Sequence, residues 1–266
     1  MLRNEGPLPS HPLAAILKKR TMAVSENKGI KISPNFYQQD WTDLDLSKDK
    51  KDDWNRAIEI FKDRIEGRYF KQIQTLDENK DRSVGLYSGF AIMSLTCLLI
   101  ETIEQFWSGN IATSKGNTPC NKRTFLSRFW RKISKSKGNT FLKEERYSIN
   151  NDSVTFYRFF QRSENLKSFF DTEQKADVFY NKIRCGLLHQ GQTKGKSLIH
   201  IRENEPVLRW INEKKIEDGI SIQRRLFIKE IRIVYDNYIT ELEKPNNLNF
   251  RKKTLEKKMK FIVEQK

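Results

Sequence analysis

Residues 84–100 read VGLYSGFAIMSLTCLLI, and this apolar run decides the fold. It is 17 residues long, and Gly85, Ser88 and Gly89 interrupt its apolar character. A membrane-spanning helix needs about 20 predominantly apolar residues, and Glu101 and Glu104 continue the same expected helix. The run therefore predicts a helix over about 83–107 that lies at the centre of a helical bundle, apolar nearly all round, and not a membrane anchor.

Amphipathic segments surround this central helix. Residues 53–76 place apolar side chains three or four positions apart, which is the spacing of one helix face: Trp54, Ile58, Phe61, Ile65, Tyr69, Ile73 and Leu76. Similar patterns predict helices at about 153–170, 171–190 and 223–243. Two short strands are expected at 197–201 and 207–210. The predicted fold is mainly α-helical, with a short β-hairpin near 197–210.

The chain divides by composition into three parts. Residues 1–50 hold prolines and acidic residues without sustained periodicity, and we expect an irregular N-terminal arm. The helical domain covers 51–244 and includes a basic insertion at about 108–150. Residues 245–266 form a basic C-terminal tail, which we expect to be frayed.

The charge balance points to a polyanionic partner. The chain has 50 Lys and Arg against 34 Asp and Glu, a net charge of +16 and a pI near 9.7. Such an excess favours nucleic acid or an acidic membrane surface. The three cysteines form no CxxC pair, and no apolar segment follows the N-terminal basic residues. We therefore expect a cytoplasmic protein without a disulfide framework.

The basic insertion is the first candidate nucleic-acid contact. Residues 105–143 contain no acidic residue and nine basic ones, and aromatic residues lie between them. Basic and aromatic side chains together can follow a phosphate backbone and stack on bases. The candidates are Arg123, Arg128, Arg131 and Lys132. The alternative is a solvated insertion whose aromatic residues pack on the core.

Most familiar catalytic patterns are absent from the sequence. It has no GxxxxGK[ST], GxGxxG, HExxH or GxSxG motif, and only three histidines. Residues 77–88 fail as a calcium-binding loop, because Arg82 replaces the required Gly and Ser88 the required Glu. Asp81 and Ser83 are better interpreted as N-cap candidates for the next helix. We expect neither a metal nor a cofactor.

One histidine stands in a distinctive context. Residues 179–193 read FYNKIRCGLLHQGQT, with Arg184 and His189 five positions apart on an apolar helix that Gly191 is expected to end. This R-x4-H spacing resembles the motif of the HEPN superfamily, whose ribonucleases carry R-x(4–6)-H near the end of a bundle helix. The resemblance covers about 53–107 and 151–243. It implies a HEPN-like helical bundle in which Arg184 and His189 are catalytic.

One residue departs from the family pattern. Cys185 follows the motif arginine, where many active members have a polar residue such as Asn, Asp or His. The departure favours a non-catalytic member over an active ribonuclease.

Helix geometry adds a condition to the motif. Five residues at 100° each leave the two side chains about 140° apart on a regular helix. Either the helix breaks, with help from Gly186 and Gly191, or two chains bring their motifs together. The resemblance implies the second arrangement, a composite site across a homodimer.

The chemistry that the resemblance implies is metal-independent cleavage of RNA. The 2′-OH of RNA attacks the adjacent phosphate, His189 moves the proton, and Arg184 holds the phosphate charge. The role implied is that of a toxin or defence nuclease with an antitoxin or other regulatory partner. The alternative is a non-catalytic module that binds nucleic acid or a protein such as a nucleotidyltransferase. A basic helical protein at a membrane surface is a third reading, carried by apolar residues in the tail.

Overall fold

The computed structural model describes residues 28–47, 50–109, 153–244 and 250–264, and it is mainly helical. The chain forms two compact units, one up to Arg64 and one from Ile65. The candidate nucleic-acid contacts Arg123, Arg128, Arg131 and Lys132 lie outside the described residues.

In the first unit, the segment expected to be an irregular arm contains ordered structure. Its described part carries α2 (Gln38–Thr42) and a bridge between Lys31 and Tyr37. Trp41 is buried. Helix α3 (Lys51–Ile65) reaches the boundary between the units, and its residues Trp54, Ile58 and Phe61 are buried, as the sequence pattern predicted. The scarcity of regular spacing concealed a short helix held by tertiary contacts.

The second unit begins with a continuous helical stretch and the apolar run. The π-helical turn η1 (Glu66–Phe70) leads into α4 (Lys71–Asp77), followed by α5 (Arg82–Tyr87) and α6 (Gly89–Ser108). Of the two expected N-cap candidates, Asp81 caps α5 by accepting the backbone N–H of Ser83. The expected single helix over 83–107 is divided at Ser88.

A buried arginine occupies the junction between α5 and α6. Arg224 donates to Asp77 and to the carbonyl of Gly85, and a side chain at Gly89 would meet its guanidinium at 2.9 Å. Gly89 therefore leaves the space through which a residue from much later in the chain crosses the junction. No local pattern could predict this crossing.

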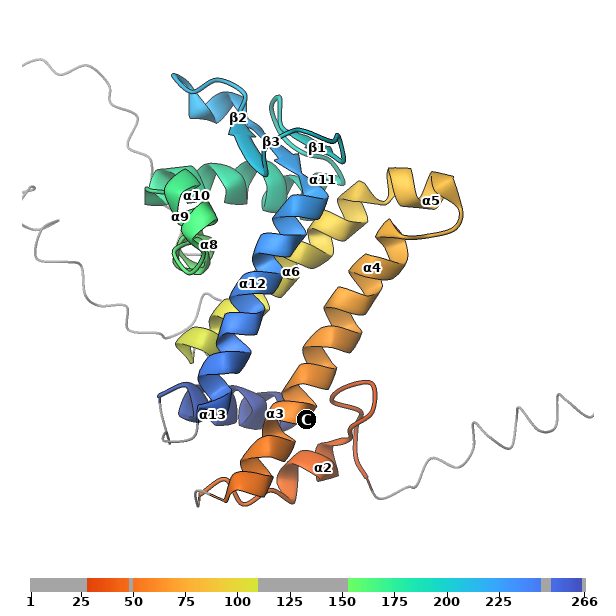
Figure 1. The fold of residues 1–266 in the computed structure, drawn as a ribbon, viewed down its shortest axis with the longest axis vertical. Helices are drawn as coiled ribbons and strands as arrows, with labels where there is room; N and C mark the ends of the chain where they lie inside the picture. Colours follow the sequence, from red (N-terminus) through yellow and green to blue (C-terminus); the bar gives the residue numbers. More distant parts are fainter. Residues whose placement is uncertain (1–27, 48–49, 110–152, 245–249, 265–266) are drawn as a thin grey trace, which may run out of the picture. The chain divides into compact units, whose positions relative to one another are not determined.

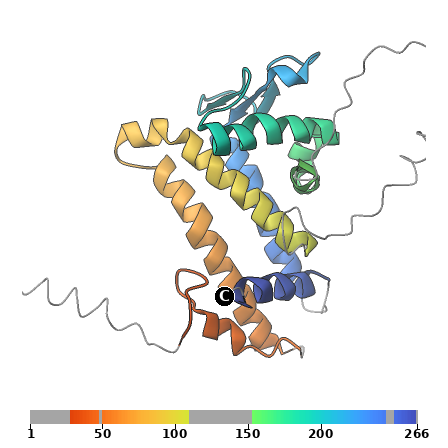
Figure 2. The same ribbon diagram turned by 180° about the vertical axis from the view of Figure 1, so that it is seen from behind.

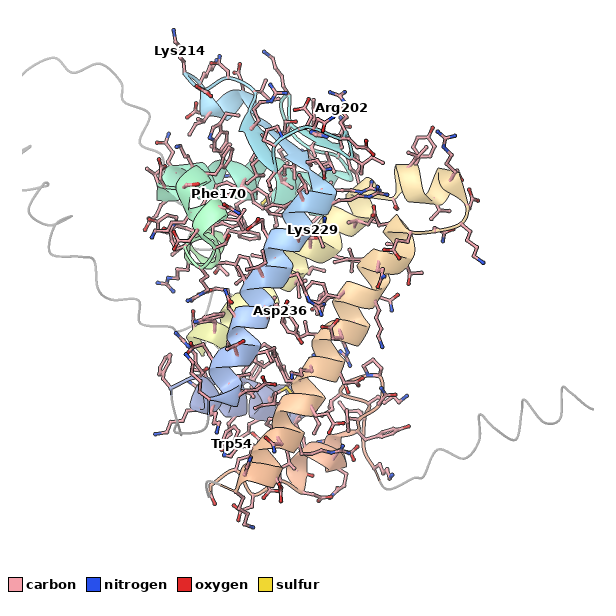
Figure 3. The ribbon with its side chains drawn as sticks, viewed as in Figure 1. Trp54, Phe170, Arg202, Lys214, Lys229 and Asp236 are labelled. Atoms are coloured by element: carbon pink, nitrogen blue, oxygen red, sulfur yellow. The ribbon has the colours of Figure 1, made fainter. Side chains whose placement is uncertain are left out.

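Other helices of this unit pack on α6. Helix α12 (Arg224–Glu243) runs alongside α6, and α4 packs on α6 as well (Figure 1). Helix α8 (Ser153–Phe160), α9 (Glu164–Phe169) and α10 (Glu173–Phe179) add a cluster of aromatic rings. Phe170, labelled in Figure 3, stacks on Phe160 with 4.0 Å between ring centroids. Both rings are fully buried, so this cluster is a second centre of the core.

The sheet differs from the expected hairpin. Strands β1 (Leu198–His200) and β2 (Leu208–Trp210) do not pair with each other, because β3 (Ile220–Gln223) lies between them. β3 pairs parallel with β1 and antiparallel with β2. The 3-10 turn η3 (Ile216–Asp218) precedes β3. Neighbouring strands in sequence often pair directly, and here a third, fully buried strand intervenes.

The C-terminal segment is a helix and not a frayed tail. Helix α13 (Phe250–Glu264) packs against α6 and α12. Leu255, Met259 and Val263 are buried, at spacings of four. Met259 and Val263, two of the apolar tail residues that could have entered a membrane surface, are therefore engaged within the protein.

Helix α6 also meets a length and composition test for a membrane span. Its most apolar window has a mean hydropathy of 1.3, and 56% of that window is buried inside the protein. Core helices of soluble proteins meet the same test, and the described residues are compatible with a soluble protein.

Candidate functional site

The candidate motif lies on one continuous helical segment. Helix α10 starts after Thr172, whose side chain accepts the backbone N–H of Lys175. The π-helical turn η2 (Tyr180–Arg184) follows, and then α11 (Cys185–Gln190). This segment crosses α6 (Figure 2). Short π-helical insertions in α-helices are rare and occur often at functional sites.

Two backbone hydrogen bonds end α11 where the sequence predicted. Gly191 adopts the left-handed conformation with φ of 64°. Its N–H donates to the carbonyl of Leu187 at 3.1 Å, and that of Gln192 donates to the carbonyl of Gly186 at 3.3 Å. The first bond, from the left-handed glycine to the carbonyl four residues earlier, is the αL pattern of helix termination. It fixes His189 on the last turn.

Arg184 faces α6. Its Nε donates to Glu101 Oε1 at 2.8 Å, and the two side chains are 20% and 14% exposed. The guanidinium also lies over the ring of Tyr180, 5.4 Å from its centroid. Burial lowers the pKa of Arg184, but the hydrogen bond and charge of Glu101 outweigh burial and raise it above its ordinary value. Arg184 is thus a charged side chain that an ion pair fixes at the contact between the motif helix and α6.

His189 has different surroundings. It is exposed on the last turn of α11. Within residues 28–47, 50–109, 153–244 and 250–264, no hydrogen bond or ion pair involves its ring. The imidazole is therefore open to a substrate or to a second protein surface. The structure gives the two motif residues separate environments, as the angle of about 140° on a regular helix led us to expect.

Two cysteines border the arginine and glutamate pair. Cys185 is half-buried beside Arg184, and Cys97 lies fully buried one turn before Glu101 on α6. Burial raises the pKa of the Cys97 thiol, and the charge of Glu101 raises it further. A buried neutral thiol is a small apolar group and a poor nucleophile. Cys97 therefore serves as a buried packing residue beside the candidate motif.

Glu101 is the residue whose role the sequence left open. Glu101 and Glu104 end the same apolar run, and either could have capped a solvated helix end. In the structure Glu101 pairs with Arg184, whereas Glu104 is buried against Arg162. Only Glu101 contacts the motif. The partners are 83 residues apart, so no local signal joined them.

The loop after His189 folds back onto the motif helix. The backbone N–H of Lys194 donates to the carbonyl of Lys182 at 2.9 Å. A Cβ on Gly186 would lie 2.5 Å from the carbonyl oxygen of Gln192, so the missing side chain makes room for this loop. The sequence offered Gly186 as a helix-breaking residue, but the helix continues through it. Because Gly186 has no side chain, the loop can approach the helix closely at this position.

Two further observations concern possible metal ligands and similarity to known proteins. In the described part of the chain, no group of three or more His, Cys, Asp or Glu side chains could hold a metal ion. Comparisons with protein-family models, curated proteins and solved structures found no match to this chain.

Proposed function

We propose that the protein is a HEPN-type endoribonuclease that cleaves RNA without a metal ion. The observation that carries the proposal is that one helical segment presents an arginine fixed by an ion pair and an exposed histidine. Arg184 is fixed by Glu101, and His189 stands exposed at the end of the same helical segment. Cleavage of RNA requires both kinds of group: one stabilises the charge on the phosphate, and the other transfers protons.

The proposed reaction uses the nucleophile that RNA itself carries. His189 removes the proton of the 2′-OH or protonates the leaving 5′-oxygen, since imidazole titrates near neutral pH. Arg184 stabilises the charge that develops on the phosphate, because a guanidinium stays protonated and donates in a fork. The products are a 2′,3′-cyclic phosphate and a 5′-hydroxyl. DNA lacks the 2′-OH and is spared.

The active form proposed is a homodimer. Arg184 turns toward α6 while His189 turns to solvent, so one chain does not bring them together. The non-buried side of α6 includes Phe90, 41% exposed, and Leu98, 38% exposed, and Glu101 lies on the same side. Leu188, next to His189, is 38% exposed. An exposed apolar surface bordering the motif is suited to a second copy of the chain.

The cellular role proposed follows from the same resemblance. A ribonuclease of this kind acts in the cytoplasm as a toxin or in defence, under the control of an antitoxin or another regulatory partner. The charge of +16 suits an RNA substrate.

The second candidate function is a non-catalytic module that binds nucleic acid or a protein partner. Cys185 favours it, because a half-buried thiol replaces the polar residue found after the motif arginine in many active members. This module would bind RNA without turnover.

Cleavage of total RNA in EDTA separates the two functions. We expect the wild type to produce fragments that end in 2′,3′-cyclic phosphate, and the His189→Ala variant to produce none. Gln190→Ala is the matched control, since it changes the neighbouring exposed residue of the same turn. Equal cleavage by wild type and His189→Ala would refute the assigned chemistry. Binding without cleavage by any variant would support the module.

A further inference from the structure

Three glycines shape the loop between α11 and β1. Gly191 and Gly195 have φ of 64° and 65°, a region that glycine occupies without steric cost. Gly186 faces this loop, with the Lys194 backbone N 3.2 Å and its Cγ 3.3 Å from the place of a Cβ. The backbone of residues 191–195 is therefore laid against the motif helix.

This arrangement brings two lysines to the side of the helix that carries His189. Lys182, Gly186 and His189 follow one another at spacings of four and three, which is one helix face. Lys194 lies against Gly186 in the middle of that face. Nζ of Lys182 reaches over the loop, 3.5 Å from the place of a Cβ on Gly195. Both lysines are half-buried.

The neighbouring Lys196 already has a carboxylate partner, since its Nζ approaches Asp218 Oδ2 at 3.5 Å. No ion pair of Lys182 or Lys194 occurs among the residues that the structure describes. Two half-buried lysines on one side of the helix favour an anion beside them, because partial burial weakens the screening of their charge by water.

We propose that Lys182 and Lys194 bind the phosphates of a single-stranded RNA and lead the strand past His189. The inference rests on the proposed function and adds to it, since it assigns the substrate backbone to two lysines outside the R-x4-H motif. Backbone contacts fix the position of a nucleic acid without reading its sequence. The lysine pair therefore supplies affinity and register, while Arg184 acts at the reacting phosphate.

The salt dependence of RNA binding tests the lysine pair without any need for cleavage. A labelled single-stranded RNA is titrated in the His189→Ala background, and the double variant Lys182→Ala with Lys194→Ala is compared with it. Each lost phosphate contact reduces the slope of log K against log salt by about 0.7 for single strands, so the double variant loses about 1.4. At 0.1 M salt this corresponds to affinity weaker by about 25-fold, converging near 1 M.

The matched control removes the same charge elsewhere. Lys175→Ala with Lys196→Ala deletes two lysines that already pair with Asp171 and Asp218. We expect this variant to keep the slope of the parent. Lys182→Arg with Lys194→Arg keeps the two charges and is expected to keep the slope as well, with thermal melting confirming that all variants fold.

The outcomes separate this inference from the proposed function. An unchanged slope in the Lys182 and Lys194 double variant, or an equal loss in the control, would overturn the lysine pair. Absence of RNA cleavage by the wild type, together with the expected loss of slope, would overturn the nuclease and leave the RNA contact standing.

Discussion

At the scale of single residues, two glutamates one helical turn apart have different tasks. Glu104 is 2% exposed and receives both Nε and Nη2 of Arg162, at 2.7 and 2.9 Å. The Arg162 guanidinium also lies 4.4 Å from the ring centroid of Trp107. Glu101 receives one bond from Arg184, and their pair remains partly exposed. Glu104 therefore stabilises the fold through its ion pair with Arg162, and Glu101 orients the motif arginine.

Replacement by the neutral isostere distinguishes these tasks. We expect Glu104→Gln to lower the free energy of unfolding by about 3–5 kcal/mol, because it removes a buried carboxylate that accepts two bonds from Arg162 and leaves that arginine without its counter-charge. Glu101→Gln should cost only about 1–3 kcal/mol, and it should abolish most RNA cleavage in the folded protein. Denaturant titration and cleavage assays measure the two effects. Equal effects of both variants on stability and cleavage would contradict this division.

Two glycines of the motif provide a second contrast. A Cβ on Gly186 would meet the carbonyl oxygen of Gln192 at 2.5 Å, whereas a Cβ on Gly191 would meet nothing within 4 Å. Gly186→Ala must push the loop away, at a cost of about 1–3 kcal/mol, and should weaken RNA binding through Lys194. Gly191→Ala should cost only about 1–2 kcal/mol of stability, because alanine disfavours the left-handed conformation. Comparable RNA affinity in both variants would contradict the packing role of Gly186.

At the scale of elements, His200 connects β1 with β3. Its Nε2 lies 3.0 Å from Ser221 Oγ, and its Nδ1 accepts the backbone N–H of Arg202 at 3.3 Å. An accepting Nδ1 is unprotonated, so the neutral ring fits this position. Burial lowers the pKa of His200, and the charge of Arg202 lowers it further. Figure 3 labels Arg202 on the loop that follows β1.

The sheet should consequently lose stability in mild acid. Because the folded pKa lies below the unfolded value of 6.5, the unfolded chain takes up the proton first as pH falls. The contribution of His200 is complete above about pH 6.5 and is lost as pH falls through the folded pKa. Denaturant unfolding at pH 7.5 and 5.5 should show a smaller pH effect in His200→Gln than in wild type. An identical pH effect would exclude His200 as its source.

At the scale of the whole molecule, the proposed composite site predicts complementation between inactive variants. Arg184→Ala and His189→Ala should each be inactive, and a mixture that has exchanged subunits should regain about a quarter of wild-type cleavage, because half of the dimers hold one intact site of two. Cleavage rates before and after mixing give the measurement. No recovery in a mixture that forms mixed dimers would mean that the site lies within one chain.

The surface of the dimer has its own control. Leu98→Glu should reduce the mass found by light scattering from twice 31.6 kDa to 31.6 kDa. Ile233→Glu places the same charge at another exposed apolar residue, 48% exposed on α12, and should leave the dimer intact. A monomeric wild type would contradict the proposed assembly.

Local patterns determined those parts of the molecule that depend on neighbouring residues. The spacing of Trp54, Ile58 and Phe61 predicted the buried face of α3, and the pattern at 223–243 predicted α12, because helix periodicity is written within a few turns. Asp81 and Gly191 predicted a helix start and a helix end, since caps bond to backbone groups of the same turn. The R-x4-H spacing singled out Arg184 and His189 as candidates, and their catalytic roles stay a prediction.

Tertiary structure decided what depends on distant contacts. Strand β3 separates the two strands expected to form a hairpin, and α13 docks on α6 although its charge suggested a frayed end. Glu101 meets Arg184 across 83 residues, and Gly186 makes room for a loop that comes back to it. A sequence pattern records which face of an element is apolar, but the partner of that face is chosen by the packing of the whole chain, where burial and charge pairing are satisfied together.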